Sequence, residues 1–497
     1  MFPYKTSFHL DRKNKQALYL QLANQFITLI KNAILPPKTK LLGSRSLAVL
    51  LQVHRKTIVA CYEELALQGW VESVPKKGTF VHADLPLFYQ QKRKPVKAVD
   101  ITSKAGFQFY SDANLKSNQR NSNPKFQFLN DGISDGRLAP INELARIYRG
   151  ISQKKNAIAH LSYGSVYGNL ELRKTLVSYL NETRGLNITI DNILITRGSQ
   201  MGIFLSSKTL CKENDSVVVG ETNYSAADAT FIHQKATLLR VSVDEDGINT
   251  HQIEKICKHQ QIKAVYVTSH HHHPTTVTLS AERRIHLLNL AKEYRFAVIE
   301  DDYDYDFNYN HAPILPLASH DTNGNVIYIG SVCKTVAPVF RIGYLIAPKE
   351  FVGEVANLRR IIDRQGDALL ELTFSNFIKN GDLDRHIRKV MKIYKSRRDL
   401  FCQLLQEELP TFFQFEIPKG GMAVWVTLDK KYTWENVEKI GKKHYLEIGD
   451  WKRYDAANTK HNAIRIGFAS YTEAEIYTLI QTFKTIMNEL LLAEKPF

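Results

Sequence analysis

The chain has 497 residues, of which 44% are hydrophobic and 23% are charged. This is too long for one ordinary domain, and the composition is that of a soluble globular protein. No stretch approaches the roughly 18 consecutive apolar residues of a membrane helix, and the first residues lack the apolar core of a signal peptide. The five cysteines lie far apart without a CxxC pair, which argues against a disulfide framework or a zinc site. We therefore expect a cytoplasmic protein without a membrane partner or a metal site.

The net charge of +16 is concentrated at one end of the chain. Residues 1–82 hold twelve Lys and Arg against four Asp and Glu, a net charge of +8. Residues 83–125 hold eight against three, a net charge of +5, which leaves +3 for the rest. A basic end on a nearly neutral body suggests contact with a polyanion, although charge alone fits a solubilising surface equally well.

The first part of the chain predicts a helix-turn-helix. Three stretches have the apolar spacing of short helices: residues 17–34, 44–52 and 55–69. Pro36 follows the first stretch, and Gly69 ends the third. Because only two residues separate the second and third stretches, these helices are expected to fold around a tight turn.

Two short strands follow, over residues 70–74 and 78–83, and their basic turn makes the hairpin a wing. In a helix-turn-helix, the first residues of the second helix face the base edges of the major groove. We therefore predict that DNA is bound by the starts of two helices and by the wing tip, through Arg45, Arg55, Lys56, Thr57, Lys76, Lys77 and Gly78. The alternative is a small helical module with solvated basic faces.

The run LYLQLANQFITLIKNAILPPKTKLLGSRSLAVLLQVHRKTIVACYEELALQGWVES, followed by GTFV, resembles the GntR-type winged helix over about 65 residues. The resemblance implies a DNA-binding domain over residues 1–83, with double-stranded DNA as its partner. The chain departs from the family pattern at Lys38 and Thr39, where the family usually has glycine.

Residues 84–125 are polar, basic and poor in periodic apolar positions, which predicts a basic flexible linker. Over residues 126–497, short apolar strands alternate with helices, as in an α/β domain with a mostly parallel sheet. Its last part, from about residue 385 to 497, predicts a smaller α+β lobe. Seven strands are expected in the large sheet: residues 192–196, 216–220, 237–241, 264–269, 296–301, 326–330 and 343–347.

Residues that pyridoxal 5′-phosphate (PLP) chemistry needs follow several of these strands. Lys334 comes shortly after the strand at 326–330, where a ligand site forms at the carboxyl ends of a parallel sheet. Asp301 ends a buried strand, and such a carboxylate is costly unless it meets a cation such as a pyridinium. Gly198 precedes a helix whose backbone N–H groups can hold phosphate. The alternatives are a surface lysine and an exposed acidic loop.

Several stretches resemble fold-type I aminotransferases, and specifically the MocR/GabR-like branch of the GntR regulators, over roughly residues 126–485. They are YGSVYGNLELRKTLVSYLNETRG, ILITRGSQMG, HHHHPTTVTLSAERR, VIEDDYDYDF, GSVCKTVAPVFRIGYL and IRIGFAS. The resemblance implies a PLP cofactor and a head-to-tail homodimer.

The resemblance also implies roles for the matching residues. Lys334 would be the catalytic lysine that carries the cofactor covalently, Asp301 would pair with the ring nitrogen, and Tyr303 would meet the phenolic oxygen. Arg465 would grip the carboxylate of a substrate or effector, a bidentate task that suits guanidinium. The other implied cofactor contacts are Tyr224 against the ring, His272 near it, Ser199, Gln200, Ser331 and Arg341 on the phosphate, and Tyr163 reaching the phosphate of the other subunit.

The run His270–His273 invites a metal interpretation. Adjacent residues of an extended chain point to opposite faces, so four in a row cannot all converge on one ion. We expect this run to line the cofactor pocket, with incidental exposure and metal binding as the alternatives. The chain departs from the family pattern at Cys333, where serine is usual, and at His272, where Gln is commoner.

These features favour a transcription regulator that senses PLP, an amine or an amino acid through an aminotransferase-like domain. The first alternative is an active aminotransferase with an appended DNA-binding domain, and partial transamination is compatible with both. The second alternative is a constitutive DNA-binding protein whose large domain only dimerises.

Overall fold

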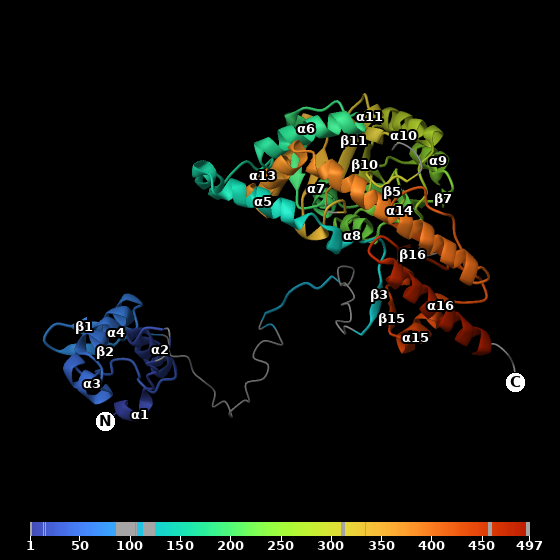
Figure 1. Cartoon of the computed structure of the whole chain (residues 1–497). Helices are drawn as coiled ribbons and strands as arrows, with labels where there is room; N and C mark the ends of the chain where they lie inside the picture. The colour runs from blue at the N-terminus through green and yellow to red at the C-terminus, as the bar shows by residue number, and fades with distance from the viewer. Residues whose placement is uncertain are drawn as a thin grey trace. The chain divides into compact units, whose positions relative to one another are not determined.

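The computed structural model describes residues 2–12, 14, 16–85, 105, 107–112, 125–309, 314–332, 334–455 and 460–493. The chain divides into two compact units, Met1–Tyr110 and Ser111–Phe497 (Figure 1). Most of the predicted linker and Cys333 lie outside the described residues, so the predicted domain boundaries stay predictions. Among the helices that the structure describes, none is long and apolar enough to cross a membrane.

The first unit is a winged helix. Its elements in chain order are α1 (Tyr4–Ser7), α2 (Leu18–Lys31), α3 (Ser44–Leu51), α4 (Arg55–Leu67), β1 (Val71–Val74) and β2 (Gly78–Val81). The strands pair antiparallel and form the predicted wing. The sequence analysis missed α1, which places Tyr4 and Phe8 in the core, where the Phe8 ring lies 4.5 Å from that of Phe26. A four-residue helix is too short to show a helical period.

The turn between α3 and α4 has the backbone of a helix-turn-helix. Gln52 caps α3 in the left-handed conformation with φ of +54°. His54 then caps α4, because its ring nitrogen accepts a hydrogen bond from the backbone N–H of Lys56 at 3.2 Å. Leu47 and Ile58 pack in the shared core, and the start of α4 stays on the surface.

Lys38 adopts a left-handed backbone, with φ of +66°, while its N–H donates to the carbonyl of Val81 at 2.9 Å. This conformation costs a non-glycine residue about 1 kcal/mol, which glycine avoids. Part of that gain is offset because glycine has a freer unfolded state and loses more entropy on folding. We expect Lys38→Gly to raise the opening free energy of the winged helix by about 0.5 kcal/mol, measured by amide hydrogen exchange on the full chain. Lys40→Gly is the control and should lower it, because φ of Lys40 is not positive.

The second unit is built on a seven-stranded sheet. The strand order is β4-β12-β11-β10-β9-β5-β6; only β12 runs antiparallel to its neighbours. These strands are β4 (Ile193–Thr196), β5 (Ser216–Gly220), β6 (Thr237–Val241), β9 (Ala264–Val267), β10 (Ala297–Asp302), β11 (Val326–Ser331) and β12 (Gly343–Ile346). All seven predicted strands are therefore confirmed, as is the mostly parallel sheet.

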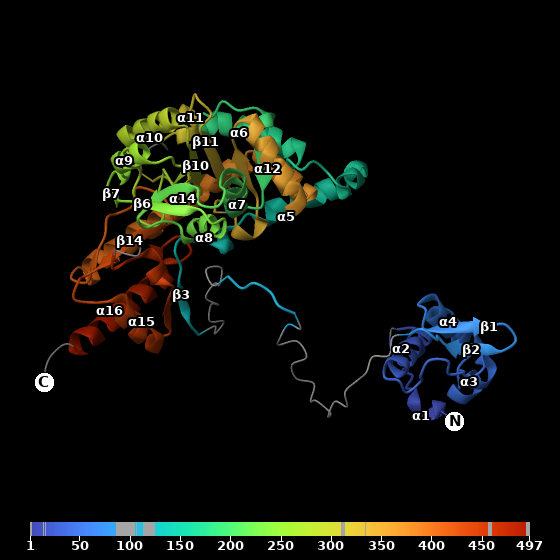
Figure 2. The same cartoon turned by 180° about the vertical axis from the view of Figure 1, so that it is seen from behind.

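Helices cover both faces of this sheet (Figures 1 and 2). One face packs against α7 (Ser199–Leu210), α8 (Ser225–His233) and α12 (Lys349–Ile362). The other packs against α6 (Leu170–Arg184), α9 (Thr250–His259), α10 (Ala281–Tyr294) and α13 (Ala368–Lys379). Val217 and Val219 face the first layer and Val218 the second, which is the period-two alternation of a strand buried on both sides.

The smaller lobe contains the antiparallel sheet β13-β14-β16 and three helices. Its elements are α14 (Asp382–Glu408), β13 (Phe413–Gln414), β14 (Ala423–Leu428), α15 (Trp434–Gly441), β15 (Leu446–Ile448), β16 (Ala463–Gly467) and α16 (Glu473–Ala493). The structure adds β3 (Gln127–Leu129), which pairs in parallel with β15 across more than 300 residues of chain. The unit also contains α5 (Ile141–Ser152), β7 (Val243–Asp244), β8 (Gly247–Ile248), α11 (Leu317–His320) and several 3-10 helices.

Candidate functional site

Three consecutive acidic residues end β10, and their side chains alternate between the faces of the sheet. Glu300 accepts hydrogen bonds from the backbone N–H groups of Leu317 and Ala318, at 2.8 and 3.0 Å. Asp302, on the same face, accepts one from the Tyr328 hydroxyl at 2.6 Å. Both carboxylates are thus held by neighbouring elements. Because side chains alternate along a strand, Asp301, which lies between them, faces the opposite side of the sheet.

Asp301 is buried with one oxygen unused. Its Oδ2 accepts a hydrogen bond from the Tyr266 hydroxyl at 2.8 Å, whereas its Oδ1 has no partner among the described residues. Burial raises the pKa of Asp301 to about 7, with further increases from Asp302 and Asp304. A buried acceptor of this kind is costly unless a positively charged donor meets it.

Lys334 lies three residues beyond β11, half-buried, and its Nζ donates to the carbonyl of Gly132 at 2.5 Å. Its charge acts on two carboxyl groups: it lowers the pKa of Asp301 and that of Asp131. The sequence prediction that Lys334 and Asp301 meet at one end of the sheet is therefore consistent with the structure.

Arg465, on β16, is buried and bonded to three parts of the same pocket. Its Nε donates to the carbonyl of Asp131 at 2.9 Å, and its Nη1 donates to the carbonyl of Pro274 at 3.1 Å. Its Nη2 lies 3.2 Å from the Tyr303 hydroxyl, which itself donates to the carbonyl of His271 at 2.8 Å. The smaller lobe thus supplies a buried cation to the site, and Tyr303 is fixed beside it.

Asp131 and Arg453 were not predicted from the sequence. Arg453 Nη2 donates to the Asp131 carboxylate at 2.8 Å, and His273 Nε2 lies 3.9 Å from the same oxygen. Burial opposes ionisation, but nearby His273 and the charges of Arg453 and Lys334 hold the pKa of Asp131 below its usual range. No short motif surrounds these residues; only the folded chain brings residues 131, 273 and 453 together.

The four consecutive histidines take four separate partners, as the strand geometry predicted. His270 Nδ1 lies 3.2 Å from Asp302, and His271 Nδ1 lies 2.9 Å from Asp304. His272 Nδ1 lies 2.8 Å from the Thr275 hydroxyl, and burial lowers its pKa to about 3. They do not converge on one ion.

His273, rather than the predicted His272, contacts the aromatic residues of the site. Its ring packs edge-on to Tyr224, with the centroids 5.1 Å apart, and to Tyr303, with the centroids 6.2 Å apart. Burial lowers the pKa of His273 to about 4, so the ring is neutral at physiological pH. Burial also raises the pKa of Tyr224 to about 12. The role of His272 toward the cofactor ring stays a prediction, and the geometry favours its neighbour.

An anion cradle lies where α7 begins. Gly198 caps α7 with φ of +79°, and a Cβ there would come within 2.8 Å of the Arg341 guanidinium. Arg341 Nη2 donates to the carbonyl of Arg197 at 2.8 Å, which holds the cation over the helix N-terminus. Gly343 is equally constrained, since its Cβ would lie 2.7 Å from the backbone of Gly198. A helix N-terminus beneath a guanidinium suits a phosphate.

Four further residues were predicted to contact phosphate, and the structure places them as follows. The side chain of Gln200 donates to Thr230 at 2.9 Å, so it joins α7 to α8. Ser331 Oγ donates to the carbonyl of Ile342 at 3.1 Å, and Ser199 is the first residue of α7. Tyr163 is 78% exposed, with the Arg364 guanidinium 4.2 Å from its ring centroid. Their roles toward phosphate remain predictions.

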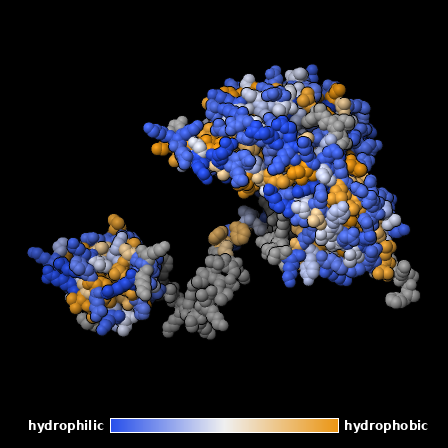
Figure 3. Space-filling model, in the orientation of Figure 1, coloured by the Kyte–Doolittle hydropathy of each residue, from blue (hydrophilic) through white to orange (hydrophobic). Residues whose placement is uncertain are grey.

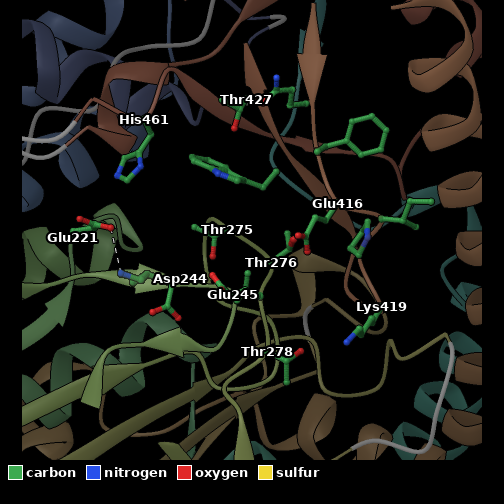
Figure 4. Close-up of a pocket in the computed structure, with 17 residues that line it drawn as sticks. Glu221, Asp244, Glu245, Thr275, Thr276, Thr278, Glu416, Lys419, Thr427 and His461 are labelled. Atoms are coloured by element: carbon green, nitrogen blue, oxygen red, sulfur yellow. Dashed lines mark hydrogen bonds between the residues drawn. The ribbon is translucent and has the colours of Figure 1, made fainter. Parts of the chain in front are cut away.

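A pocket of about 540 Å³ is lined in part by residues 275–278, the segment that follows His273 and Pro274. Figure 4 shows carboxylates around it from both lobes, with one lysine and one histidine: Glu221, Asp244, Glu245, Glu416, Lys419 and His461. Trp425 lines it and packs edge-on to Tyr454, which lies next to His273. The lining therefore carries excess negative charge close to the site.

In the winged helix, the predicted DNA contacts are on the surface. Arg45, Arg55 and Lys56 are exposed, and Arg55 Nε lies 3.4 Å from the Ser44 hydroxyl. A groove of about 670 Å³ separates α4 from the wing and is lined by several residues, including Lys40, Lys76, Lys77 and Gly78. Thr57 is half-buried, so the start of α4 is open to a ligand through Arg55 and Lys56.

A family model described as aminotransferase class I and II matches residues 151–483. The chain belongs to this family. Two relatives extend over nearly the whole chain. The uncharacterized HTH-type transcriptional regulator YdfD of Bacillus subtilis is 27% identical over 488 residues, covering 97% of this chain and 99% of YdfD. The HTH-type transcriptional regulator NorG of Staphylococcus aureus is 26% identical over 471 residues, covering 91% of this chain and 100% of NorG.

Among solved structures, the kynurenine aminotransferase of Pyrococcus horikoshii in complex with PMP is similar, with a TM-score of 0.71 and 27% identity. The match covers 77% of this chain and 98% of that one. Together with the regulators, it confirms the fold-type I architecture and the predicted resemblance to MocR/GabR-like proteins.

The family's cofactor, PLP, fits the residues of this site. The unused oxygen of Asp301 can accept the ring N–H, and the cradle at Gly198 and Arg341 can hold the phosphate. Lys334 could supply the amine, and Tyr224 and Tyr303 are aromatic residues near Asp301. The donor and acceptor types match the group at both ends.

Proposed function

We propose that this chain is a DNA-binding transcription regulator that uses PLP to sense an amine or amino-acid effector. One observation carries the proposal: the chain joins a winged helix with an open α4 N-terminus to a complete cofactor constellation around Lys334. The full-length similarity to YdfD and NorG supports this combination. Such a regulator acts on DNA, so we place it in the cytoplasm.

When bound, PLP supplies an electrophilic carbon that reacts with amines. The chain's own residues would select which amine stays. Arg465 suits the carboxylate of an effector, but in this structure its Nε is bonded to the carbonyl of Asp131. An incoming carboxylate would therefore compete with Asp131 for Arg465.

This competition gives a route from the effector to DNA. Asp131 directly follows Asn130, whose side chain holds the N–H groups of Gly132 and Ile133 at 3.0 Å each. This turn is continuous with β3, the first strand after the predicted linker. Displacing Asp131 from Arg465 would move β3 and shift the two winged helices of a dimer between arrangements.

A homodimer is part of the proposal. Large apolar side chains are exposed on α5, on the 3-10 helix that follows it and at the end of α12: Ile141, Tyr148, Ile158, Leu161, Ile361 and Ile362. Figure 3 shows hydrophobic residues that interrupt the hydrophilic surface of the second unit. Tyr163, which the family resemblance directs to the other subunit, is exposed next to this group. Apolar surface of this kind suits a partner copy, and a head-to-tail arrangement would exchange Tyr163.

The deciding experiment is a DNA-binding titration on the promoter upstream of the chain's own gene. We expect removal of PLP, or addition of the right compound from a panel of amines and amino acids, to change the affinity about fivefold or more. Fluorescence anisotropy at fixed salt concentration measures this change. If the affinity for promoter DNA stays constant under all these conditions, the result would contradict the proposal and favour constitutive DNA binding.

An active aminotransferase is the second candidate, because the cofactor constellation is complete. Turnover of an amino acid–keto acid pair at on the order of 1–10³ s⁻¹ would favour it. Slow half-reactions without turnover would leave sensing as the main role.

Arg55→Ala should weaken operator binding by roughly tenfold to 100-fold, because an arginine at the start of α4 can bond guanine in two places. Lys77→Ala, at the wing, should weaken all DNA sequences equally and lower the salt dependence by about one counterion. Lys5→Ala is the control, since Lys5 is exposed on α1, outside the predicted interface. Anisotropy on operator and random DNA separates the two effects. Equal loss by Arg55→Ala on both DNAs would contradict base reading.

A further inference from the structure

Two histidines and one glutamate meet on the surface of the second unit, where α9 packs beside α10. His251 and Glu254 are three residues apart on α9, which puts them on one helix face, and His286 lies opposite on α10. One ligand atom from each lies within 4.8 Å of the other two. We propose that His251, Glu254 and His286 bind a divalent transition metal ion, and that Zn²⁺ suits them well.

The distances match those of a tetrahedral site. With bonds of about 2.1 Å, two ligand atoms on one zinc ion lie roughly 3.4 Å apart. His286 Nε2 and Glu254 Oε2 are 3.5 Å apart. Two imidazoles on one such ion would have ring centroids roughly 5.2 Å apart, and those of His251 and His286 are 4.9 Å apart. The ligand atom of His251 lies within 4.8 Å of the other two, and the exposed His251 side chain would move toward them to complete the set.

The orientation of His286 is fixed in the way that metal-binding histidines require. Its Nδ1 lies 2.9 Å from the hydroxyl of Thr250, a fully buried residue at the start of α9. That bond leaves Nε2 directed to Glu254. A ligating histidine almost always has such a partner on its second nitrogen, which fixes the tautomer and the ring plane.

The two carboxylate oxygens of Glu254 face different neighbours. Its Oε1 accepts a hydrogen bond from Lys258 at 2.5 Å, and its Oε2 faces His286. The glutamate would thus bind the metal through one oxygen, with water in the remaining position.

The sequence analysis predicted no metal site, because its signals were cysteine spacing and the histidine run. The three ligands here come from two helices, and His286 lies more than 30 positions beyond Glu254 in the chain. A bound ion would join α9 to α10. The proposal is independent of the proposed DNA and PLP chemistry.

The test uses untagged, full-length protein stripped with EDTA, in a Zn²⁺ titration against a chromophoric chelator. Wild type should bind one Zn²⁺ ion per chain. The His251→Ala and His286→Gln variants should each bind Zn²⁺ with an affinity about 100-fold weaker or more. His259→Ala is the matched control, since His259 is exposed on the same helix outside the trio, and it should bind as wild type does.

Thr250 provides a second readout that a simple surface charge would not give. Thr250→Val should weaken Zn²⁺ binding roughly tenfold to 100-fold, and Thr250→Ser, which keeps the hydroxyl, should restore it. Wild-type protein that takes up no Zn²⁺ would overturn the proposal. So would His251→Ala and His286→Gln variants that bind as wild type does, because the ion would then lie elsewhere.

Discussion

Replacing Lys334 by alanine is expected to abolish covalent attachment of PLP and, with it, any response of DNA binding to an amine effector. Lys334 Nζ donates a hydrogen bond to the carbonyl of Gly132 at the carboxyl end of the sheet. Its charge lowers the pKa of both Asp131 and Asp301. The variant then has no amine at position 334. We expect the visible absorbance of the loaded protein to disappear and noncovalent retention of PLP to fall by about 100-fold or more.

The absorbance spectrum of the purified protein and the promoter titration measure these effects together. Lys349→Ala is the control, because Lys349 is an exposed lysine of the same unit whose ion pair with Asp191 lies on the surface. It should keep both the spectrum and the response. A Lys334→Ala protein that keeps the wild-type spectrum would show that another lysine carries the cofactor.

Asp301→Asn is expected to act in opposite directions on cofactor binding and on stability. Asparagine keeps the shape and can still accept the Tyr266 hydrogen bond, but it brings no negative charge to the ring nitrogen. PLP binding should therefore weaken strongly. The cofactor-free protein should become more stable at neutral pH, because the buried, half-satisfied carboxylate is gone.

The pH dependence follows from the raised pKa. In the folded protein the pKa of Asp301 is about 7, against an ordinary value of 3.8, so between these values the folded state binds more protons than the unfolded state. The stability of the cofactor-free protein should thus fall as pH rises from 4 to 7. At 1.36 kcal/mol per pKa unit, this cost reaches up to about 4 kcal/mol above pH 7. Asp301→Asn should remove that slope.

Thermal unfolding of the cofactor-free protein between pH 5 and 8 measures this slope. Asp302→Asn is a matched control: Asp302 is equally buried, but His270 and Tyr328 hold its pKa below the ordinary value despite burial. That substitution should destabilise the protein at neutral pH. If both variants were destabilising, the Asp301 carboxylate would have a partner that satisfies it without the cofactor.

Much of the fold could be predicted because the relevant signals are local. Each of the seven strands is a short apolar run, and the alternation of Val217, Val218 and Val219 between two helical layers follows from the strand period. Asp301 and Lys334 could be paired because Asp301 is near the end of one parallel strand and Lys334 follows another, and the carboxyl ends of parallel strands share one edge of the sheet. The missed α1 and β3 are too short to carry such a period.

Other parts of the site depend on contacts that no local pattern records. Which of four consecutive histidines faces the aromatic residues is decided by Asp302, Asp304 and Thr275, which hold the three others. Asp131 joins the site only because β3 pairs with a strand of the smaller lobe. The role of His272 that the family resemblance implies stays a prediction, and the contact of His273 with Tyr224 and Tyr303 could not be read from a motif, since a motif aligns positions but does not give ring directions.

The sequence by itself therefore determined the winged helix, the seven strands and the lysine–aspartate pair at their end, because helix period, strand alternation and chain direction are properties of short segments. Only the tertiary structure decided that His273 lies against Tyr224 and Tyr303, that the Asp131 carbonyl holds Arg465, and that His251, Glu254 and His286 meet. Each of those contacts includes residues from elements that are far apart in the chain, so its geometry exists only after the elements have packed.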